Sequence, residues 1–92
     1  MQRTRIPEES IPSKLKELPP GWSRKGDLLY KEFVFPDFIK AFAFLTEVAI
    51  HSQVLDHHPR IVNTYNRVQL ELWTHDVGGI SEFDIELAKR IG

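Results

Sequence analysis

The longest hydrophobic pattern in the chain runs from Asp37 to Leu55, where apolar residues recur every three or four positions without a glycine or proline. This spacing predicts an amphipathic helix, and Asp37 is a suitable N-cap for it. Eight residues should form the face that packs on a sheet: Phe38, Ala41, Phe42, Leu45, Val48, Ala49, Ser52 and Leu55. A second apolar face, roughly 120° away around the helix, contains Ile39, Ala43, Ile50 and Val54.

The second face would be exposed to solvent in a monomer that covered only one side of this helix. Either the chain buries both faces itself, or the outer face is a subunit interface. Because little sequence remains to cover a second face, the pattern favours the interface. We therefore expect a homodimer or homotetramer that associates through the 37–55 helix, a sheet edge, or both.

Shorter runs of β-branched, aromatic and alternating apolar residues predict strands at 22–24, 28–35, 60–65 and 67–74. Lys25-Gly26-Asp27 has the composition of a hairpin turn between the first two strands. In the last strand, Val68, Leu70 and Leu72 alternate with Gln69, Glu71 and Trp73, so one face should be buried.

A final helix is predicted to begin at Ser81, with an apolar stripe made of Ile80, Phe83, Leu87, Ala88 and Ile91. The elements then follow the order strand, strand, helix, strand, strand, helix. This order predicts an α+β domain: a four-stranded antiparallel sheet with helices packed on one face.

The N-terminal segment, residues 1–12, is polar and contains Pro7 and Pro12, so we expect a flexible arm. Ser13 can cap a short helical turn that ends before Pro19. The predicted organisation is an arm at 1–12 and a single domain at 13–92.

Composition narrows the classes of protein. The 92 residues suffice for one domain, and 12 Lys and Arg against 13 Asp and Glu give a formal net charge of -1. This charge gives no general attraction to nucleic acid or to an anionic membrane. The chain has no cysteine, which excludes disulfides, thiolate chemistry and cysteine-ligated zinc. No run approaches the roughly 20 residues of a membrane span, and no signal-peptide core is evident. We expect a soluble cytoplasmic protein.

Three of the four histidines form the candidate chemistry: His57 and His58, which lie between Asp56 and Pro59, and the more distant His75. An imidazole can donate or accept a proton near neutral pH. Pro59 restricts the backbone before it, so the pair should occupy a rigid loop between a helix and a strand. His75 follows a predicted strand, and strand pairing would bring it beside that loop. The pattern indicates acid–base chemistry.

Two other interpretations of these histidines remain open at this point. An isolated His-His-Pro sequence often belongs to a surface loop. Three histidines can also bind zinc with an open coordination position. However, separations of one and then seventeen residues are not a familiar spacing for zinc ligands.

The spacing around the histidines resembles the signature of the pterin-4a-carbinolamine dehydratase family. In that signature His-His-Pro is followed by an aromatic residue, a histidine and an aspartate at fixed intervals, which Tyr65, His75 and Asp84 satisfy. The similarity covers about residues 14–92. One position of the signature is not matched: Gln53 stands four positions before His57, where the signature has a charged residue. An amide can hold a hydrogen bond but carries no charge.

The resemblance implies a hydro-lyase that dehydrates 4a-hydroxytetrahydrobiopterin to quinonoid dihydropterin, without a cofactor or metal. It assigns His57, His58 and His75 to binding and protonating the pterin. We expect His57 and His75 to be the acid–base pair and His58 to bind or orient the substrate. Further candidate substrate-binding residues are Asp56, Trp73, Thr74 and Gln53. The implied setting is recycling of the cofactor of an aromatic amino acid hydroxylase.

Other polar and aromatic residues have simpler explanations. Asp84 fits a capping box at the start of the last helix, which explains it better than catalysis does. Tyr65 and Trp73 are better explained by packing, although the Trp73 indole is suited to line a flat aromatic ligand. Asp56 is a candidate to orient a neighbouring imidazole. His51 should be solvated on the helix surface.

A competing hypothesis is a non-catalytic binding, assembly or dimerisation-cofactor module on the same scaffold. The resemblance allows it, because a vertebrate family member also serves as dimerisation cofactor of a homeodomain transcription factor. The second apolar face of the 37–55 helix supports this hypothesis. The presence of all three histidines favours the enzyme.

Overall fold

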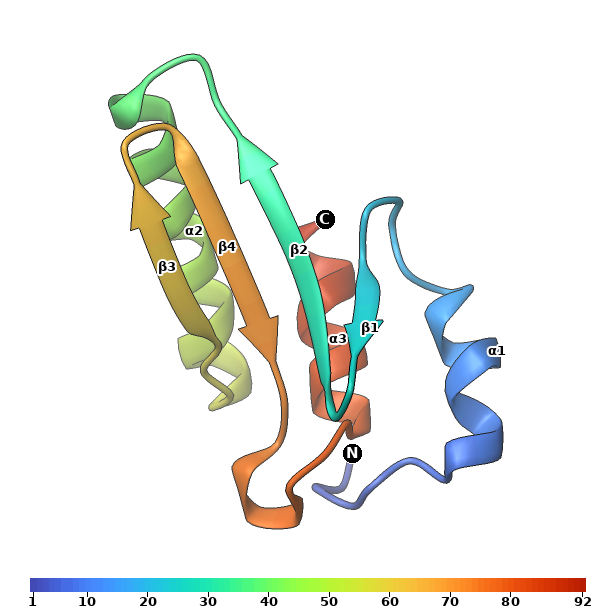
Figure 1. Cartoon of the computed structure of the whole chain (residues 1–92). Helices are drawn as coiled ribbons and strands as arrows, with labels where there is room; N and C mark the ends of the chain where they lie inside the picture. The colour runs from blue at the N-terminus through green and yellow to red at the C-terminus, as the bar shows by residue number, and fades with distance from the viewer.

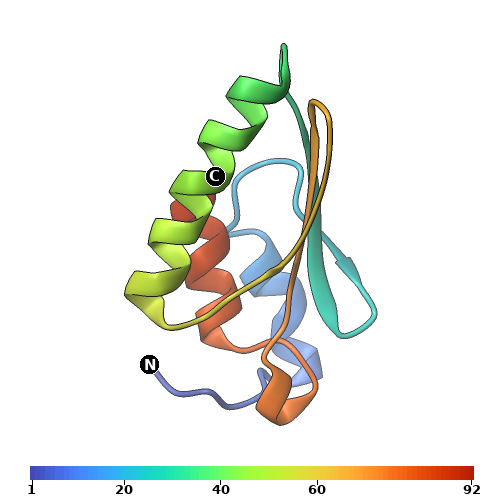
Figure 2. The same ribbon diagram turned by 90° about the vertical axis from the view of Figure 1, so that its left-hand side faces the viewer.

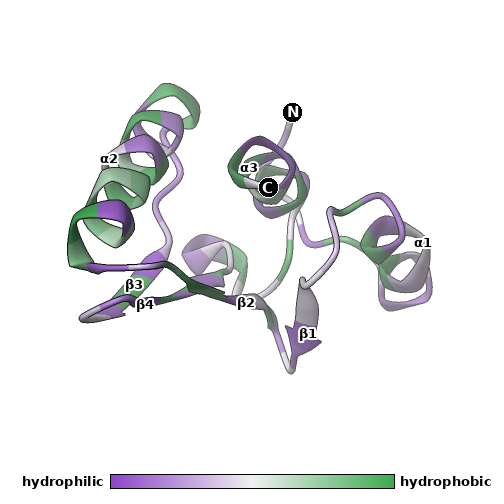
Figure 3. Ribbon diagram, turned by 90° about the horizontal axis from the view of Figure 1, so that it is seen from above, coloured by the Kyte–Doolittle hydropathy of each residue, from purple (hydrophilic) through white to green (hydrophobic).

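Figure 1 shows the computed structural model, which describes residues 1–92 as an antiparallel sheet with helices. The elements in chain order are η1 (Glu8–Ser10), α1 (Ile11–Leu15), β1 (Ser23–Lys25), β2 (Leu28–Val34), α2 (Phe38–Leu55), β3 (Arg60–Thr64), β4 (Arg67–Leu72), η2 (His75–Val77) and α3 (Glu82–Ile91). The strand order is β1-β2-β4-β3, and each neighbouring pair is antiparallel. Helices α2 and α3 cover one face of the sheet (Figures 2 and 3), and α1 lies beyond β1. The predicted α+β architecture is confirmed.

The two central strands, β2 and β4, supply most of the apolar face of the sheet. Leu29 lies opposite Leu72 in the ladder, and the alternating residues Val68, Leu70 and Leu72 are all buried, as the sequence pattern predicted. The ladder of β4 ends at Leu72, two residues earlier than expected. Residues 73–74 therefore leave the sheet, which brings their side chains to the cavity described below.

Helix α2 contacts the sheet through a narrower stripe than the sequence predicted. Ala41, Val48 and Ser52 are buried. Phe44 was not assigned to the core, yet its ring centroid lies 4.6 Å from that of Phe33 on β2. Successive residues of a helix are about 100° apart. When these residues face the sheet, other apolar side chains of α2 therefore point away from it.

Three residues expected in the core stripe of α2 are exposed instead: Phe38, Phe42 and Ala49. The second apolar face is exposed as well, as its pattern predicted for a single copy of the chain, with Ile39 at 76% and Val54 at 69% of full exposure. Figure 3 shows that much of the α2 ribbon is green, the colour of hydrophobic residues. The outer side of α2 is therefore more apolar than the sequence pattern indicated.

Helix α2 is long and apolar enough to cross a membrane by length and composition alone. This differs from the expectation that no run approaches a membrane span. In the folded chain, α2 packs on the sheet and contains the charged residues Lys40 and Glu47.

The N-terminal segment differs from the expected flexible arm, because it packs on the domain. Ile6 and Ile11 are buried in the core that also contains Leu72 and Ile85. The backbone N–H of Ile6 donates to the carbonyl of Ile80 over 2.8 Å. Two isolated isoleucines among polar residues gave no periodic signal, so the sequence did not reveal this packing. Helix α1 likewise begins at Ile11 rather than after Ser13.

Candidate active site

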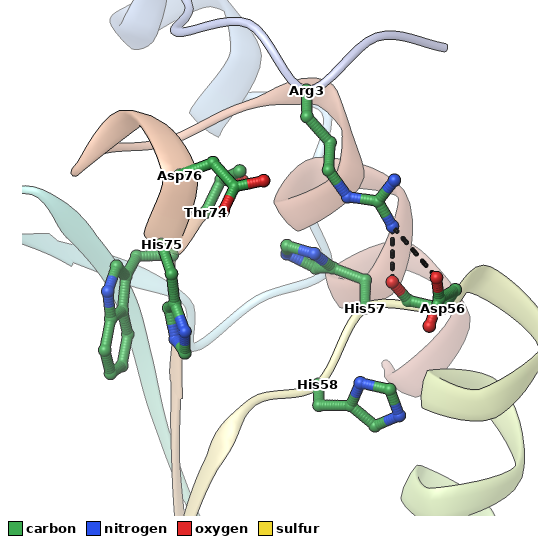
Figure 4. Close-up of a pocket in the computed structure, with 8 residues that line it drawn as sticks. Arg3, Asp56, His57, His58, Thr74, His75 and Asp76 are labelled. Atoms are coloured by element: carbon green, nitrogen blue, oxygen red, sulfur yellow. Dashed lines mark hydrogen bonds and ion pairs between the residues drawn. The ribbon is translucent and has the colours of Figure 1, made fainter.

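The structure contains one cavity, of about 170 Å³, at the end of the sheet where α2 and β4 terminate. Figure 4 shows its lining side chains, which come from three separate parts of the chain. These are the N-terminal segment, the α2–β3 loop and the segment that follows β4. The eight lining residues are Arg3, Asp56, His57, His58, Trp73, Thr74, His75 and Asp76. The fold thus brings together the three histidines that the sequence singled out.

The end of α2 sets the direction of the two adjacent histidines. Asp56 adopts a left-handed conformation with φ of 50°, which stops the helix. The N–H of His57 then donates to the carbonyl of Ser52 over 2.9 Å, which closes the last turn. Pro59 favours an extended backbone at His58. As a result His57 is buried, at 7% of full exposure, whereas the neighbouring His58 is exposed.

His57 is held by a carboxylate from the first turn of α3. Its Nε2 lies 2.5 Å from Oδ1 of Asp84, and the Asp84 side chain has no exposed surface. Oδ2 of Asp84 accepts hydrogen bonds of 2.9 Å from the Thr74 hydroxyl and from the Ser81 N–H. A buried carboxylate with three donors is well satisfied. The α3 N-terminus further stabilises its negative charge.

The hydrogen-bond network assigns the proton positions on His57. The Phe83 N–H donates to the Ser81 hydroxyl, which lies 2.6 Å from the Thr74 hydroxyl. Because the single Thr74 hydroxyl proton goes to Asp84, Ser81 donates to Thr74. An ionised carboxylate only accepts, so Nε2 of His57 carries a proton and points at Asp84. In the neutral imidazole, Nδ1 is then the free nitrogen.

Asp84 therefore has two functions in the structure. The predicted capping box with Ser81 is present. The same carboxylate also contacts His57, a contact that the sequence interpretation did not assign. The expectation that Asp56 would orient an imidazole is not met. Its carboxylate is 86% exposed, and the charged group nearest to it is the Arg3 guanidinium at 4.0 Å.

His75 is the first residue of η2 and is exposed at the cavity. Its ring centroid lies 4.5 Å from that of the half-buried Trp73, which also lines the cavity. Thr74, between them, is buried, and its hydroxyl is engaged with Asp84 and Ser81. The segment thus presents an indole and an imidazole, while the Thr74 hydroxyl is used internally.

Gln53 lies one helical turn before His57 and does not line the cavity. Its Oε1 lies 3.3 Å from Nε2 of His58. Gln53, which replaces the charged residue of the family signature, therefore contacts the site only through His58. No group of three or more His, Asp or Glu side chains in the chain has an arrangement that holds a metal ion.

Two lining residues, Arg3 and Asp76, were not among the predicted site residues. Asp76 adjoins His75, so its position was available from the sequence neighbourhood. Arg3 lies 53 residues before Asp56 in the sequence, and no local pattern links them. Only the folded chain reveals its position.

The fold and this site define a small α+β domain with three imidazoles around one cavity. Known proteins are similar to this chain in sequence and fold. A family model described as pterin 4 alpha carbinolamine dehydratase matches residues 4–92. A protein of Thermomicrobium roseum is 46% identical over 95% of this chain and 92% of its own length. One of Sulfurisphaera tokodaii is 41% identical over 95% and 92%, and both are provisionally named pterin-4-alpha-carbinolamine dehydratase.

A solved structure has the same fold as this chain. The Brucella melitensis protein described as a transcriptional coactivator/pterin dehydratase superposes with a TM-score of 0.90 at 36% sequence identity. The superposition covers 96% of this chain and 95% of that one. The chain belongs to the pterin 4 alpha carbinolamine dehydratase family.

Proposed function

We propose that this protein catalyses the dehydration of a pterin-4a-carbinolamine, with 4a-hydroxytetrahydrobiopterin as the expected substrate. The observation that carries the proposal is the grouping of His57, His58 and His75 around one cavity. Membership of the dehydratase family and the names of the relatives support the same reaction. The enzyme is a hydro-lyase that works without a cofactor.

The reaction breaks the bond between ring carbon C4a and its hydroxyl and removes the proton from the adjacent nitrogen N5. The C–O electron pair leaves with the protonated hydroxyl as water. The N5–H electron pair forms the C4a=N5 double bond of the quinonoid dihydropterin. One group that donates a proton and one that accepts a proton are sufficient for this step, and imidazoles suit both functions near neutral pH.

His57 and His75 form the proposed acid–base pair. Asp84 holds His57 with Nδ1 free, so this nitrogen is the one that exchanges a proton with the substrate. The exposed His75 faces the cavity beside the Trp73 indole, which offers a flat apolar surface to the pterin ring. His58, held by Gln53, binds or orients the substrate.

The remaining predicted substrate contacts are Asp56, Trp73, Thr74 and Gln53. Asp56 and Trp73 line the cavity with exposed or half-exposed side chains, which suits direct contact. Thr74 and Gln53 act through Asp84 and His58 in this proposal. The biological setting is cytoplasmic recycling of the pterin cofactor used by an aromatic amino acid hydroxylase.

The test follows the decay of freshly generated 4a-hydroxytetrahydropterin by ultraviolet absorbance, with and without the protein. We expect the wild-type protein to dehydrate the substrate faster than the spontaneous reaction does. In His57→Ala the catalysed rate should fall by about 10²- to 10⁴-fold. His51→Ala is the matched control, because His51 lies on α2 outside the cavity lining. No acceleration by the folded wild-type protein would refute the proposal.

A second candidate function is supported by the exposed apolar side of α2. Phe38, Ile39, Phe42, Ile50 and Val54 are all exposed there. We propose that this side mediates assembly, first of the chain with itself as a homodimer or homotetramer. It could also serve a partner protein, and the solved relative from Brucella melitensis is described as a coactivator as well as a dehydratase.

Sedimentation at micromolar concentration tests assembly through α2. The wild type should be a dimer or tetramer, and the double substitution of Ile50 and Val54 by Glu should give a folded monomer, because burial of two carboxylates is costly. A wild type that sediments only as a monomer would contradict this proposal. A binding module would tolerate alanine at all three site histidines, whereas the enzyme would not.

A further inference from the structure

Arg3 is one of two cavity-lining residues, with Asp76, that the proposed chemistry leaves without a function. Its guanidinium donates to the backbone carbonyls of Leu55 and Asp56, at the C-terminal end of α2. Its Cζ also lies 4.1 Å from the centroid of the Phe83 ring. A cation at a helix C-terminus is favoured by the helix dipole. These contacts join the N-terminal segment to both α2 and α3.

The carbonyl of Asp56 belongs to the peptide bond that precedes His57. Arg3 binds the oxygen of that peptide, and the Ser52 carbonyl accepts from its N–H over 2.9 Å. Both polar atoms of the peptide are therefore fixed. Without Arg3, the oxygen would lose its side-chain partner at a position where the backbone is in the left-handed region.

Arg3 is also linked to the His57 imidazole through the Phe83 ring. The Phe83 ring centroid lies 5.6 Å from that of His57, so Phe83 contacts both Arg3 and His57. Figure 4 shows Arg3 extended from the N-terminal segment toward Asp56. The N-terminal segment is anchored by a backbone bridge between Arg5 and Ser81 and by the buried Ile6. Arg3 thus projects from a fixed support.

We propose that Arg3 is a positioning residue, which fixes the Asp56–His57 peptide and thereby aims the His57 imidazole at the substrate. The inference rests on the proposed dehydratase function. It makes the N-terminal segment a part of the active site. Arg3 acts on the chemical step through His57, so its loss should lower kcat more than it raises KM.

The experiment compares Arg3→Ala and Arg3→Lys with Arg90→Ala. The control removes the same charge from an ion pair with Glu86 on α3, away from the cavity. We expect kcat of Arg3→Ala to fall about 10- to 100-fold, as a small misplacement of a reacting group does, with KM nearly unchanged. Arg3→Lys should be intermediate, because an ammonium keeps the charge near the carbonyls but lacks the planar guanidinium that lies over the Phe83 ring. A few millimolar guanidinium should restore part of the rate of Arg3→Ala but not that of Arg90→Ala.

A second readout is independent of activity. NMR of the His57 ring and hydrogen exchange of its backbone N–H should show a mobile His57 in Arg3→Ala and an unchanged one in Arg90→Ala. If the wild type lacks activity, the proposed function fails, and the His57 measurements alone decide on Arg3. Unchanged His57 signals in Arg3→Ala, or a kcat within twofold of the wild type, would overturn the inference. If Arg3→Ala does not fold, the same criteria apply to Arg3→Lys.

Discussion

Nε2 of His57 lies 2.5 Å from Oδ1 of Asp84, and both side chains are buried. The two residues are 27 positions apart, one in the loop after α2 and the other in the first turn of α3. The contact fixes the orientation of the imidazole and leaves one nitrogen for the substrate.

Asp84→Asn keeps the shape of the side chain and removes its charge. The amide has one acceptor oxygen, whereas the carboxylate accepts from donors at both oxygens. We expect kcat to fall by about 10²-fold or more, because the imidazole loses the group that sets its tautomer. Unfolding should also become easier by about 1–3 kcal/mol, because a buried donor is left unsatisfied.

The control for Asp84→Asn is Glu82→Gln, which removes a charge from the same helical turn at an exposed ion pair with Lys14. It should keep the wild-type rate. A wild-type rate in Asp84→Asn, measured by the same absorbance assay, would show that the carboxylate serves only as a helix cap.

His75→Ala removes the second proposed acid–base group without opening a buried cavity, since His75 is exposed. We expect a loss of about 10²- to 10⁴-fold in kcat with an unchanged melting temperature. His51→Ala should retain full activity in the same assay. If His75→Ala instead raises KM alone, His75 binds the substrate and does not transfer a proton.

Gln53→Glu restores a charged residue at the position where the family signature has one. A carboxylate would accept a stronger hydrogen bond from His58 than the present amide, whose Oε1 lies 3.3 Å away, and would favour the protonated imidazole. The value of kcat/KM for dehydration should therefore rise relative to the native protein, because the charged hydrogen bond holds His58 more firmly. Gln53→Met, which removes the hydrogen bond, should not show this change. Equal kcat/KM values for all three proteins would mean that this position matters little to the reaction.

Glu32 provides a test of stability against pH on the outer face of the sheet. Hydrogen bonds from Arg67 and then Gln69 hold the pKa of Glu32 below its ordinary value of 4.5. A lowered folded-state pKa contributes stability that is present above about pH 4.5 and lost as the pH falls through the folded-state value. The stability advantage of the wild type over Glu32→Gln should therefore shrink below pH 4.5.

Chemical denaturation between pH 3 and 7 measures this advantage. It should be small and should weaken with added salt, because the pair is exposed. Glu9→Gln is the charge-matched control, because it removes a carboxylate from an exposed position on η1. If the stability advantage of the wild type over Glu32→Gln stays constant down to pH 3, the pKa of Glu32 is not lowered by Arg67 and Gln69.

The elements of this fold were largely readable from the sequence, because they depend on local periodicity. The alternation through Val68, Leu70 and Leu72 gave β4, and the long apolar repeat gave α2. His57, His58 and His75 were singled out by the resemblance of their spacing to the family signature, whereas Asp84 was interpreted as a helix cap. Periodicity did not reveal which side chains of α2 face the sheet. Phe42 and Phe44 are equally apolar, and only the position of Phe33 on β2 shows that Phe44 is the one in contact.

The sequence by itself determined the α+β order of elements, the family and the histidines as candidate groups. Only the tertiary structure decided that Asp84 rather than Asp56 holds His57, that residues 1–12 pack on the domain, and that Arg3 reaches the end of α2. The physical reason is the range of the interactions. Secondary structure follows from neighbours within a few residues, whereas these contacts join segments 27 and 53 residues apart, whose meeting depends on how the helices pack on the sheet.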